Sequence, residues 1–152
     1  MLQSHHPELI DINLVSLDLA ALGYADWTHS NSIDYNEELV TIQNKYFKKS
    51  GFEKKIFFHL GNAIEIIPKL KGPFELVFID ADKINYETYF DFVIPKMSKG
   101  GLIISDNVMW SGKVLDEFDS IDESTVALKK YNKKASFKDN KNPTYLIADI
   151  RR

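Results

Sequence analysis

FELVFID at Phe74–Asp80 and GLIISD at Gly101–Asp106 are the two stretches that decide the fold. Both are short, dense in β-branched and aromatic residues, and of the length expected for buried strands. Between them, Tyr86–Met97 carries apolar residues at helical spacing, and Lys99–Gly101 follows as the exit from that helix. A strand, a helix and a second strand in this order predict a parallel sheet covered by helices on both faces.

The same alternation continues upstream of these strands. Asn36 is a good N-cap for a helix that is expected to stop at Gly51. Apolar residues recur in it at helical spacing: Leu39, Val40, Ile42, Tyr46 and Phe47. Lys55–Leu60 follows as another strand and Asn62–Leu70 as a second, shorter helix.

Two more elements are expected downstream, a helix over Asp122–Lys134 and an edge strand over Thr144–Ile150. With 152 residues, of which 44% are hydrophobic and 27% charged, the chain has the composition of one soluble globular domain. We therefore predict a single α/β domain over residues 1–152, doubly wound around a mostly parallel sheet.

Composition and charge exclude several classes of function. A net charge of −3 and a sequence pI of about 5.8 are atypical of a nucleic-acid-binding protein. No stretch approaches the about 18–20 continuous apolar residues that a membrane span requires, so no membrane partner is expected. Met1–Val15 lacks the basic start and apolar run of a signal peptide, and cysteine is absent. These features lead us to expect a cytoplasmic protein.

Polar residues follow the two deciding strands at the edge of the sheet where ligands bind in such folds. Asp80 ends the first strand, with Lys83 shortly after it, and Asp106 and Asn107 end the second. Two carboxylates and a carboxamide at neighbouring strand ends would suit Mg²⁺, Mn²⁺ or Ca²⁺. Taken singly, Asp106 and Asn107 are more typical of a turn, Asp80 of a helix cap, and Lys83 of a solvated surface.

The runs VFIDADKINYETYF (Val77–Phe90) and GGLIISDNVMWSGKVLD (Gly100–Asp116) resemble the bacterial branch of the caffeoyl-CoA and catechol O-methyltransferase family. GNAIEIIPKL (Gly61–Leu70) and SIDYNEELVTIQNKYFKKSGF (Ser32–Phe52) are similar to the preceding segments of that family, in the same order. The resemblance implies a Rossmann-like fold that uses S-adenosylmethionine (SAM) and a divalent metal. It covers about Ile33 to about Tyr131.

The resemblance also implies roles for individual residues. Asp80, Asp106 and Asn107 match the family's metal ligands, and Lys83 matches its general base, beside Asp80 in the catalytic set. The cofactor-binding positions that match are Asp34, Asn62, Ala63, Asp80, Gly23 and Tyr24, of which Asp34 accepts hydrogen bonds from the ribose. The family more often has Asp at the position of Asn62. Trp110 matches an aromatic residue near the metal loop, where packing against the core is an equal alternative.

The first part of the chain departs from the family pattern. The glycine-bearing cofactor loop corresponds to Leu17–Ala25, in which only Asp18, Gly23 and Tyr24 follow the pattern, and Ala20 replaces a glycine. With that alignment the first helix is expected to be shortened or lost. The upstream helices and the final hairpin of the family are not recognisable either, so the fold is expected to be truncated at both ends.

The leading hypothesis is thus a SAM-dependent O-methyltransferase acting on a catechol-like or phenolic small molecule with a divalent metal. The alternative is a non-catalytic or impaired remnant of the same fold, with a structural or interaction role, because of the altered glycine loop. An unrelated doubly wound nucleotide-binding protein would need a phosphate-cradling glycine-rich turn after a strand, and no such turn is present. A homodimer is possible, since family members commonly dimerise.

Overall fold

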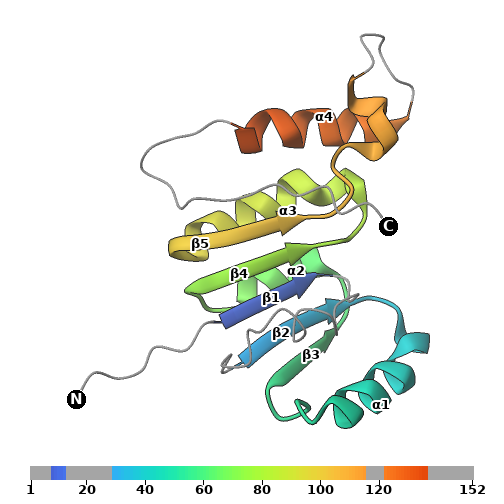
Figure 1. Ribbon diagram of the computed structural model, residues 1–152, viewed down its shortest axis with the longest axis vertical. Helices are drawn as coiled ribbons and strands as arrows, with labels where there is room; N and C mark the ends of the chain where they lie inside the picture. Colours follow the sequence, from blue (N-terminus) through green and yellow to red (C-terminus); the bar gives the residue numbers. More distant parts are fainter. Residues whose placement is uncertain (1–7, 13–28, 116–121, 137–152) are drawn as a thin grey trace.

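The computed structural model describes residues 8–12, 29–115 and 122–136 (Figure 1). Within them, five strands form one sheet in the order β3-β2-β1-β4-β5, and all the pairings between neighbours are parallel. The strands are β1 (Glu8–Ile12), β2 (His29–Asp34), β3 (Ile56–Leu60), β4 (Phe74–Ile79) and β5 (Met97–Ser105). The α/β, parallel prediction is confirmed.

Helices follow the strands in the alternating order that the sequence predicts. The α-helices are α1 (Val40–Ser50), α2 (Ala63–Ile66), α3 (Tyr86–Val93) and α4 (Glu123–Ser136). Short 3-10 turns extend them: η2 (Glu37–Leu39), η3 (Ile67–Lys69), η4 (Lys83–Asn85), η5 (Ile94–Lys96) and η6 (Trp110–Leu115). No helix of the described ranges is long and apolar enough to cross a membrane.

Local chemistry sets where the first helix begins and ends. The side chain of Asn36 accepts a hydrogen bond from the backbone N–H of Glu38 at 3.0 Å, as an N-cap should. At the other end Gly51 adopts a left-handed conformation with φ 76°, which glycine reaches without a steric cost. Both boundaries agree with the prediction.

Only part of the apolar set predicted for this helix is buried. Leu39, Ile42 and Tyr46 are exposed, whereas Gln43 and Phe47 are buried. Phe47 packs against Phe58 of β3, with ring centroids 6.3 Å apart. Gln43, one turn before Phe47, is therefore buried on the same side of the helix. The spacing of the apolar residues could not show this.

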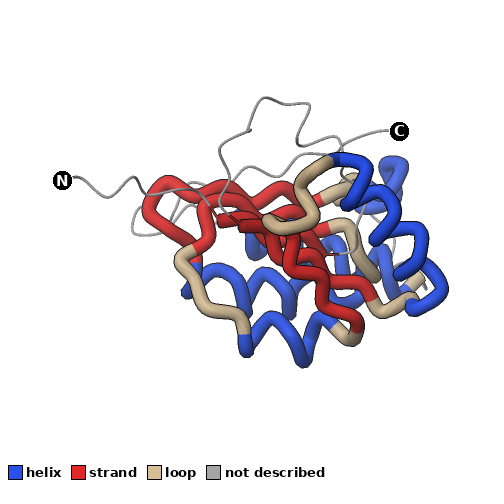
Figure 2. The backbone as a smooth tube through the Cα atoms, turned by 90° about the horizontal axis from the view of Figure 1, so that it is seen from below, coloured by secondary structure: helices blue, strands red, loops and turns tan. Residues whose placement is uncertain are grey.

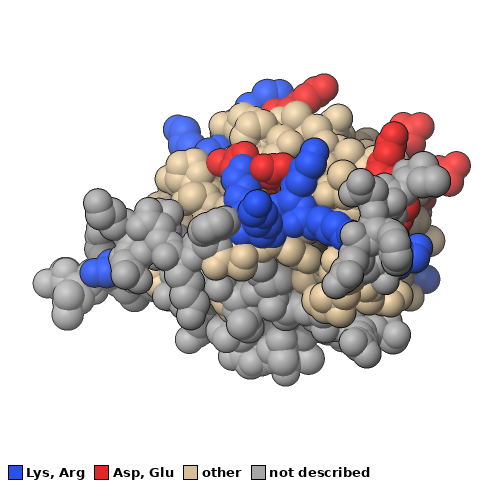
Figure 3. Space-filling view, turned by 90° about the horizontal axis from the view of Figure 1, so that it is seen from above, with Lys and Arg blue, Asp and Glu red and all other residues tan. Residues whose placement is uncertain are grey.

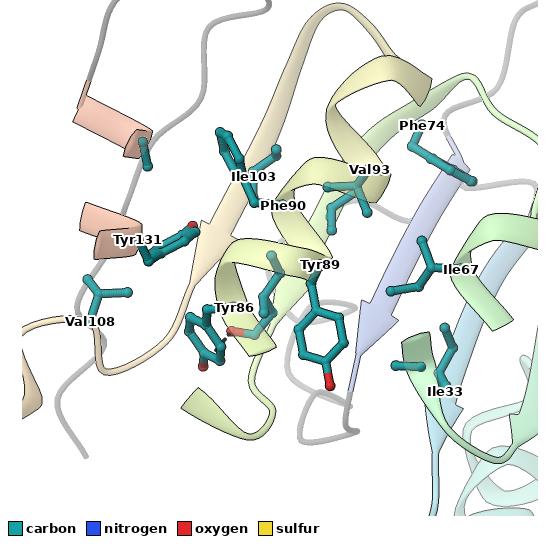
Figure 4. Close-up of a cluster of buried hydrophobic side chains, with 14 of the residues drawn as sticks. Ile33, Ile67, Phe74, Tyr86, Tyr89, Phe90, Val93, Ile103, Val108 and Tyr131 are labelled. Carbon is teal, nitrogen blue, oxygen red and sulfur yellow. Dashed lines mark hydrogen bonds between the residues drawn. The ribbon is translucent and has the colours of Figure 1, made fainter. Parts of the chain in front are cut away.

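The main core lies on the face of the sheet that α2, α3 and α4 cover. In Figure 4, Tyr86, Tyr89, Phe90 and Val93 of α3 lie among side chains from the strands and from α4. The ring of Tyr131 meets that of Tyr86 edge-on, with centroids 5.5 Å apart at 84°. This cluster joins three helices to β4 and β5 and so fixes the loops that follow those strands.

The opposite face carries a smaller cluster of Leu76 with the partly buried Leu102 and Ile104. Alternate residues of β4 point to opposite faces, since Val77 and Ile79 belong to the main core. Phe47 meets Phe58 there, so α1 lies on this second face, near β2 and β3. Figure 2 shows the strands as one twisted layer between the two sets of helices. The doubly wound prediction holds.

Several boundaries differ from those expected. The helix predicted to reach Met97 ends at Val93 and tightens into η5, because Pro95 cannot continue an α-helix. Met97 instead begins β5, which is longer than the predicted strand and pairs with Phe74 of β4. The edge strand expected over Thr144–Ile150 lies outside the described residues.

The position of the first strand is also corrected. Placing the cofactor loop at Leu17–Ala25 requires a strand that ends near Asp18, whereas β1 ends at Ile12 and pairs with both β2 and β4. The connection from β1 to β2 therefore spans residues 13–28 and is longer than the sequence alignment allowed. Ala20, Gly23 and Tyr24 lie in that connection, outside the described residues.

Candidate active site at the carboxyl ends of the strands

Three carboxylates sit at the carboxyl edge of the parallel sheet. Asp34 is the last residue of β2, Asp80 follows β4 directly, and Asp106 follows β5 directly. The backbone N–H of Asp106 donates to the carbonyl of Ile79 at 2.9 Å, so the ends of β4 and β5 are held side by side. The sheet thus brings Asp80 and Asp106 together, as the sequence predicts.

Lys83 lies between these two strand ends. Its Nζ is 3.7 Å from Oδ1 of Asp80 and donates to the backbone carbonyl of Asp106 at 3.1 Å. It also donates to the hydroxyl of Tyr86, which in turn donates to the carbonyls of Ile79 and Asp106. Only 10% of the Lys83 side chain is exposed, so this is not the solvated lysine that spacing alone would favour.

The surroundings of Lys83 act on its pKa in opposite directions. Burial lowers the pKa of the ammonium below its ordinary value, and the nearby carboxylates of Asp80 and Asp106 partly offset this by raising it. The net direction is downward. A lysine that loses its proton more readily than usual, beside two acids at a strand edge, has the properties of a general base.

The loop after β5 has an unusual backbone. Asn107, Trp110 and Ser111 have φ values of 54°, 48° and 55°, a region that residues other than glycine rarely adopt. Two contacts from the α4 side hold this loop: the indole Nε1 of Trp110 donates to Asp122 at 3.0 Å, and Asn132 donates to the carbonyl of Val108 at 2.8 Å. Such strain persists where neighbouring structure imposes it, and it is common at functional sites.

Trp110 packs against the edge of the main core, in addition to its bond to Asp122. This agrees with the packing interpretation of that residue. Asn107, the first residue of the loop, is half-buried and directly follows Asp106.

The donor set at this edge fits a hard divalent cation. Asp80 and Asp106 follow paired strands and would supply carboxylate oxygens, and Asn107, the next residue, would supply an amide oxygen. Within the described ranges no three His, Cys, Asp or Glu side chains group together, so the third donor would have to be the amide. The chemistry of these residues therefore suits Mg²⁺ or Mn²⁺ with positions left for substrate and water.

A cavity of about 390 Å³ opens beside this edge, at the ends of β2, β3 and β4. Its lining includes Asp34, Tyr35, Gly61, Asn62, Ala63 and Asp82. Gly61 has φ 144°, which a side chain would not tolerate, and its N–H donates to the carbonyl of Asp34 at 2.8 Å. Asn62 caps α2 by accepting from the N–H of Ile64 at 2.9 Å. The volume and the mixed lining suit a small organic ligand.

Two residues of this region have no role in the sequence prediction. Asp82 accepts hydrogen bonds from Tyr89 at 2.5 Å and from Asn85, and all three line the cavity. The bond to Asp82, after burial, raises the pKa of the Tyr89 hydroxyl. Gln43 donates to Asp34 from α1. Asp82 lies within the quoted FIDADK motif, which was a usable signal, whereas nothing in the sequence distinguishes Gln43.

The charged surface does not form one basic area on the face seen in Figure 3. Lys side chains lie there next to Asp and Glu side chains. Lys134 of α4, for example, pairs with Glu87 at 3.1 Å and Asp91 at 2.7 Å on α3. The expectation that nucleic acid is not a partner remains a prediction.

Known proteins similar to this chain include O-methyltransferases. A family model described as O-methyltransferase matches residues 15–147. The chain is 33% identical over 105 residues to a catechol O-methyltransferase of Niastella koreensis, which covers 66% of this chain and 47% of that protein. It is 34% identical over 131 residues to a probable caffeoyl-CoA O-methyltransferase of Arabidopsis thaliana, covering 80% and 56%. The chain therefore spans about half the length of these curated relatives.

Among solved structures, the O-methyltransferase TomG from Streptomyces achromogenes, in complex with SAM, superposes with a TM-score of 0.77. The two chains are 19% identical, and the match covers 87% of this chain and 62% of that one. At that identity the likeness shows the fold, which is Rossmann-like and shortened relative to this neighbour.

Proposed function

Because this chain belongs to the O-methyltransferase family, we propose that it transfers the methyl group of SAM to a hydroxyl of a catechol-like or phenolic small molecule, assisted by a divalent metal. The observation that carries this proposal is the place of Lys83, whose Nζ lies 3.7 Å from Asp80 and 3.1 Å from the backbone of Asp106. A proton acceptor and two metal-type ligands thus share one strand edge.

The cavity beside Asp34 is the proposed cofactor site. The carboxylate of Asp34 would accept hydrogen bonds from the ribose hydroxyls, and the start of α2 at Asn62 and Ala63 would contact the adenine. Gly23 and Tyr24, the other two cofactor-binding residues of the sequence prediction, lie outside the described residues. SAM, when bound, supplies an electrophilic methyl group on a sulfonium.

Asp80, Asp106 and Asn107 are the proposed metal ligands, with Asp80 also near the cofactor. A divalent cation held there would lower the pKa of the substrate hydroxyl. Nζ of Lys83 would take the hydroxyl proton. Burial favours this role because it lowers the pKa of Lys83. The substrate oxygen then attacks the methyl carbon as the carbon–sulfur bond breaks, which leaves S-adenosylhomocysteine. The protein contributes mainly position and charge.

A rival proposal is a binding domain of the same fold that does not catalyse the transfer. The altered glycine loop favours it, because no glycine occurs between Ile12, where β1 ends, and Gly23. The two proposals differ in one measurable property, which is methyl transfer at a rate that depends on the site residues.

The test combines calorimetry with an activity assay on the full chain. Titration with S-adenosylhomocysteine, with and without Mg²⁺, measures cofactor binding, and mass spectrometry measures methylation of 3,4-dihydroxybenzoate. Asp106→Asn and Lys83→Met should abolish methylation, whereas Asp91→Asn and Lys99→Met, matched changes away from the site, should not. Binding without methylation would favour the rival, and a folded protein that binds nothing would refute both.

A further inference from the structure

Gln43 is a buried amide in the middle of α1 for which the proposed reaction has no use. Only 6% of it is exposed, and its Nε2 donates to Oδ2 of Asp34 at 2.7 Å. The other oxygen of the same carboxylate, Oδ1, accepts from the backbone N–H of Asn36 at 2.9 Å. Two groups of this chain therefore hold Asp34, one on each oxygen.

Asp34 has two lone-pair sites left that can accept further hydrogen bonds. An ionised carboxylate offers about four lone-pair sites, two on each oxygen. Gln43 and Asn36 occupy one on each, which leaves one on each. Asp34 is 4% exposed and lines the cavity, and its two hydrogen bonds fix the plane of its carboxylate. Two acceptors in one fixed plane match two neighbouring hydroxyls.

The cost of Gln43 to the fold argues against a purely structural role. Its Oε1 is buried and has no hydrogen-bond partner among the described residues. An unmet buried acceptor destabilises a fold, and a leucine or methionine would fill the same space without one. Phe47, one turn further along α1, shows that an apolar contact suits this face. The hydrogen bond that the amide donates to Asp34 therefore explains why a glutamine stands here.

We propose that Gln43 is a positioning residue, which orients the Asp34 carboxylate so that it recognises the vicinal diol of a ribose. Gln43 itself touches neither the cofactor nor the substrate. The inference rests on the proposed function, because it places a nucleoside in the cavity. It adds a residue on α1 to a site otherwise built from the strand ends.

The test compares two ligands in matched variants of the full chain. The ligands are S-adenosylhomocysteine and its 2′,3′-dideoxy analogue, with dissociation constants from calorimetry. Gln43→Met, which loses the donor at similar size, should weaken binding of the natural ligand about tenfold, the usual order for one hydrogen bond to a charged group. The affinity for the dideoxy analogue should not change. Asn44→Met, an exposed amide on the same helix, should alter neither.

Gln43→Leu provides a second variant that fills the space and loses the donor, and it should show the same selective loss; thermal melting checks that each variant is folded. Equal weakening for both ligands, or no weakening for either, would overturn the inference while the proposed function stands. A wild-type chain that binds neither ligand would overturn the proposed function and this inference with it.

Discussion

Lys96 should be a major contributor to stability, and Lys96→Met should lower the free energy of unfolding by about 2 kcal/mol. Its ammonium donates to three backbone carbonyls where η3 ends, those of Ile67 at 2.6 Å, Pro68 at 3.0 Å and Leu70 at 2.9 Å. A hydrogen bond to a charged group contributes about 1.5–3 kcal/mol. The bond to the carbonyl of Pro68 is exposed, so water can replace it. Burial of the ammonium lowers the pKa of Lys96, and this cost offsets part of the stabilisation from the other two bonds.

Urea denaturation followed by circular dichroism measures this loss, and the slope of the transition should stay constant. In a thermal scan the midpoint should fall by about 4–8 °C, given about 2–4 °C per kcal/mol for a domain of this size. Lys99→Met, three residues further on at an exposed position, is the matched control and should change stability little. If Lys96→Met were as stable as this control, the three carbonyl contacts would not be contributing as the geometry requires.

Three further predictions use the same stability assay. Asn62→Ala should cost about 1 kcal/mol by removing the cap of α2, whereas Asn62→Asp should keep it; equal losses would contradict the capping role. Tyr131→Phe should cost about 1–3 kcal/mol because it removes the partner of the fully buried Ser105 hydroxyl, and adding Ser105→Ala should recover part of that. Burial lowers the pKa of His59 below its ordinary 6.5, so the unfolded chain binds the proton better and stability should fall as the pH drops through and below 6.5; His59→Asn should flatten this slope.

The sequence was sufficient for β3, β4 and β5 and for the alternating order of the elements, because these depend on local patterns. Runs such as Phe74–Ile79 are apolar apart from Glu75 and bounded by polar or turn residues, which is typical of a buried strand. The strand ends followed directly, and with them the positions of Asp80 and Asp106 at one edge of a parallel sheet, while the family resemblance supplied Asp34. The family motifs extended this prediction to Lys83.

The errors arose where tertiary contacts override local pattern. Of the apolar positions of α1, Phe47 is buried but Ile42 and Tyr46 are exposed. Gln43, which contacts Asp34, is buried as well. No local signal reports that a glutamine will meet a carboxylate nine residues before it. The first strand was misplaced for a different reason: Glu8–Ile12 is short, and an acidic residue also occurs at Asp18, so two alignments competed.

The geometry of the proposed metal edge depends on one register. Ile79 of β4 pairs with Ser105 of β5, so the residues that follow them, Asp80 and Asp106, emerge side by side. A shift of one residue would turn every side chain of β5 to the opposite face of the sheet. The burial of Ile103 and Ser105 against α3 and α4 excludes that shift, because it would expose them and bury Leu102 and Ile104 in their place. The core packing of β5 therefore determines where the carboxylate that follows it lies.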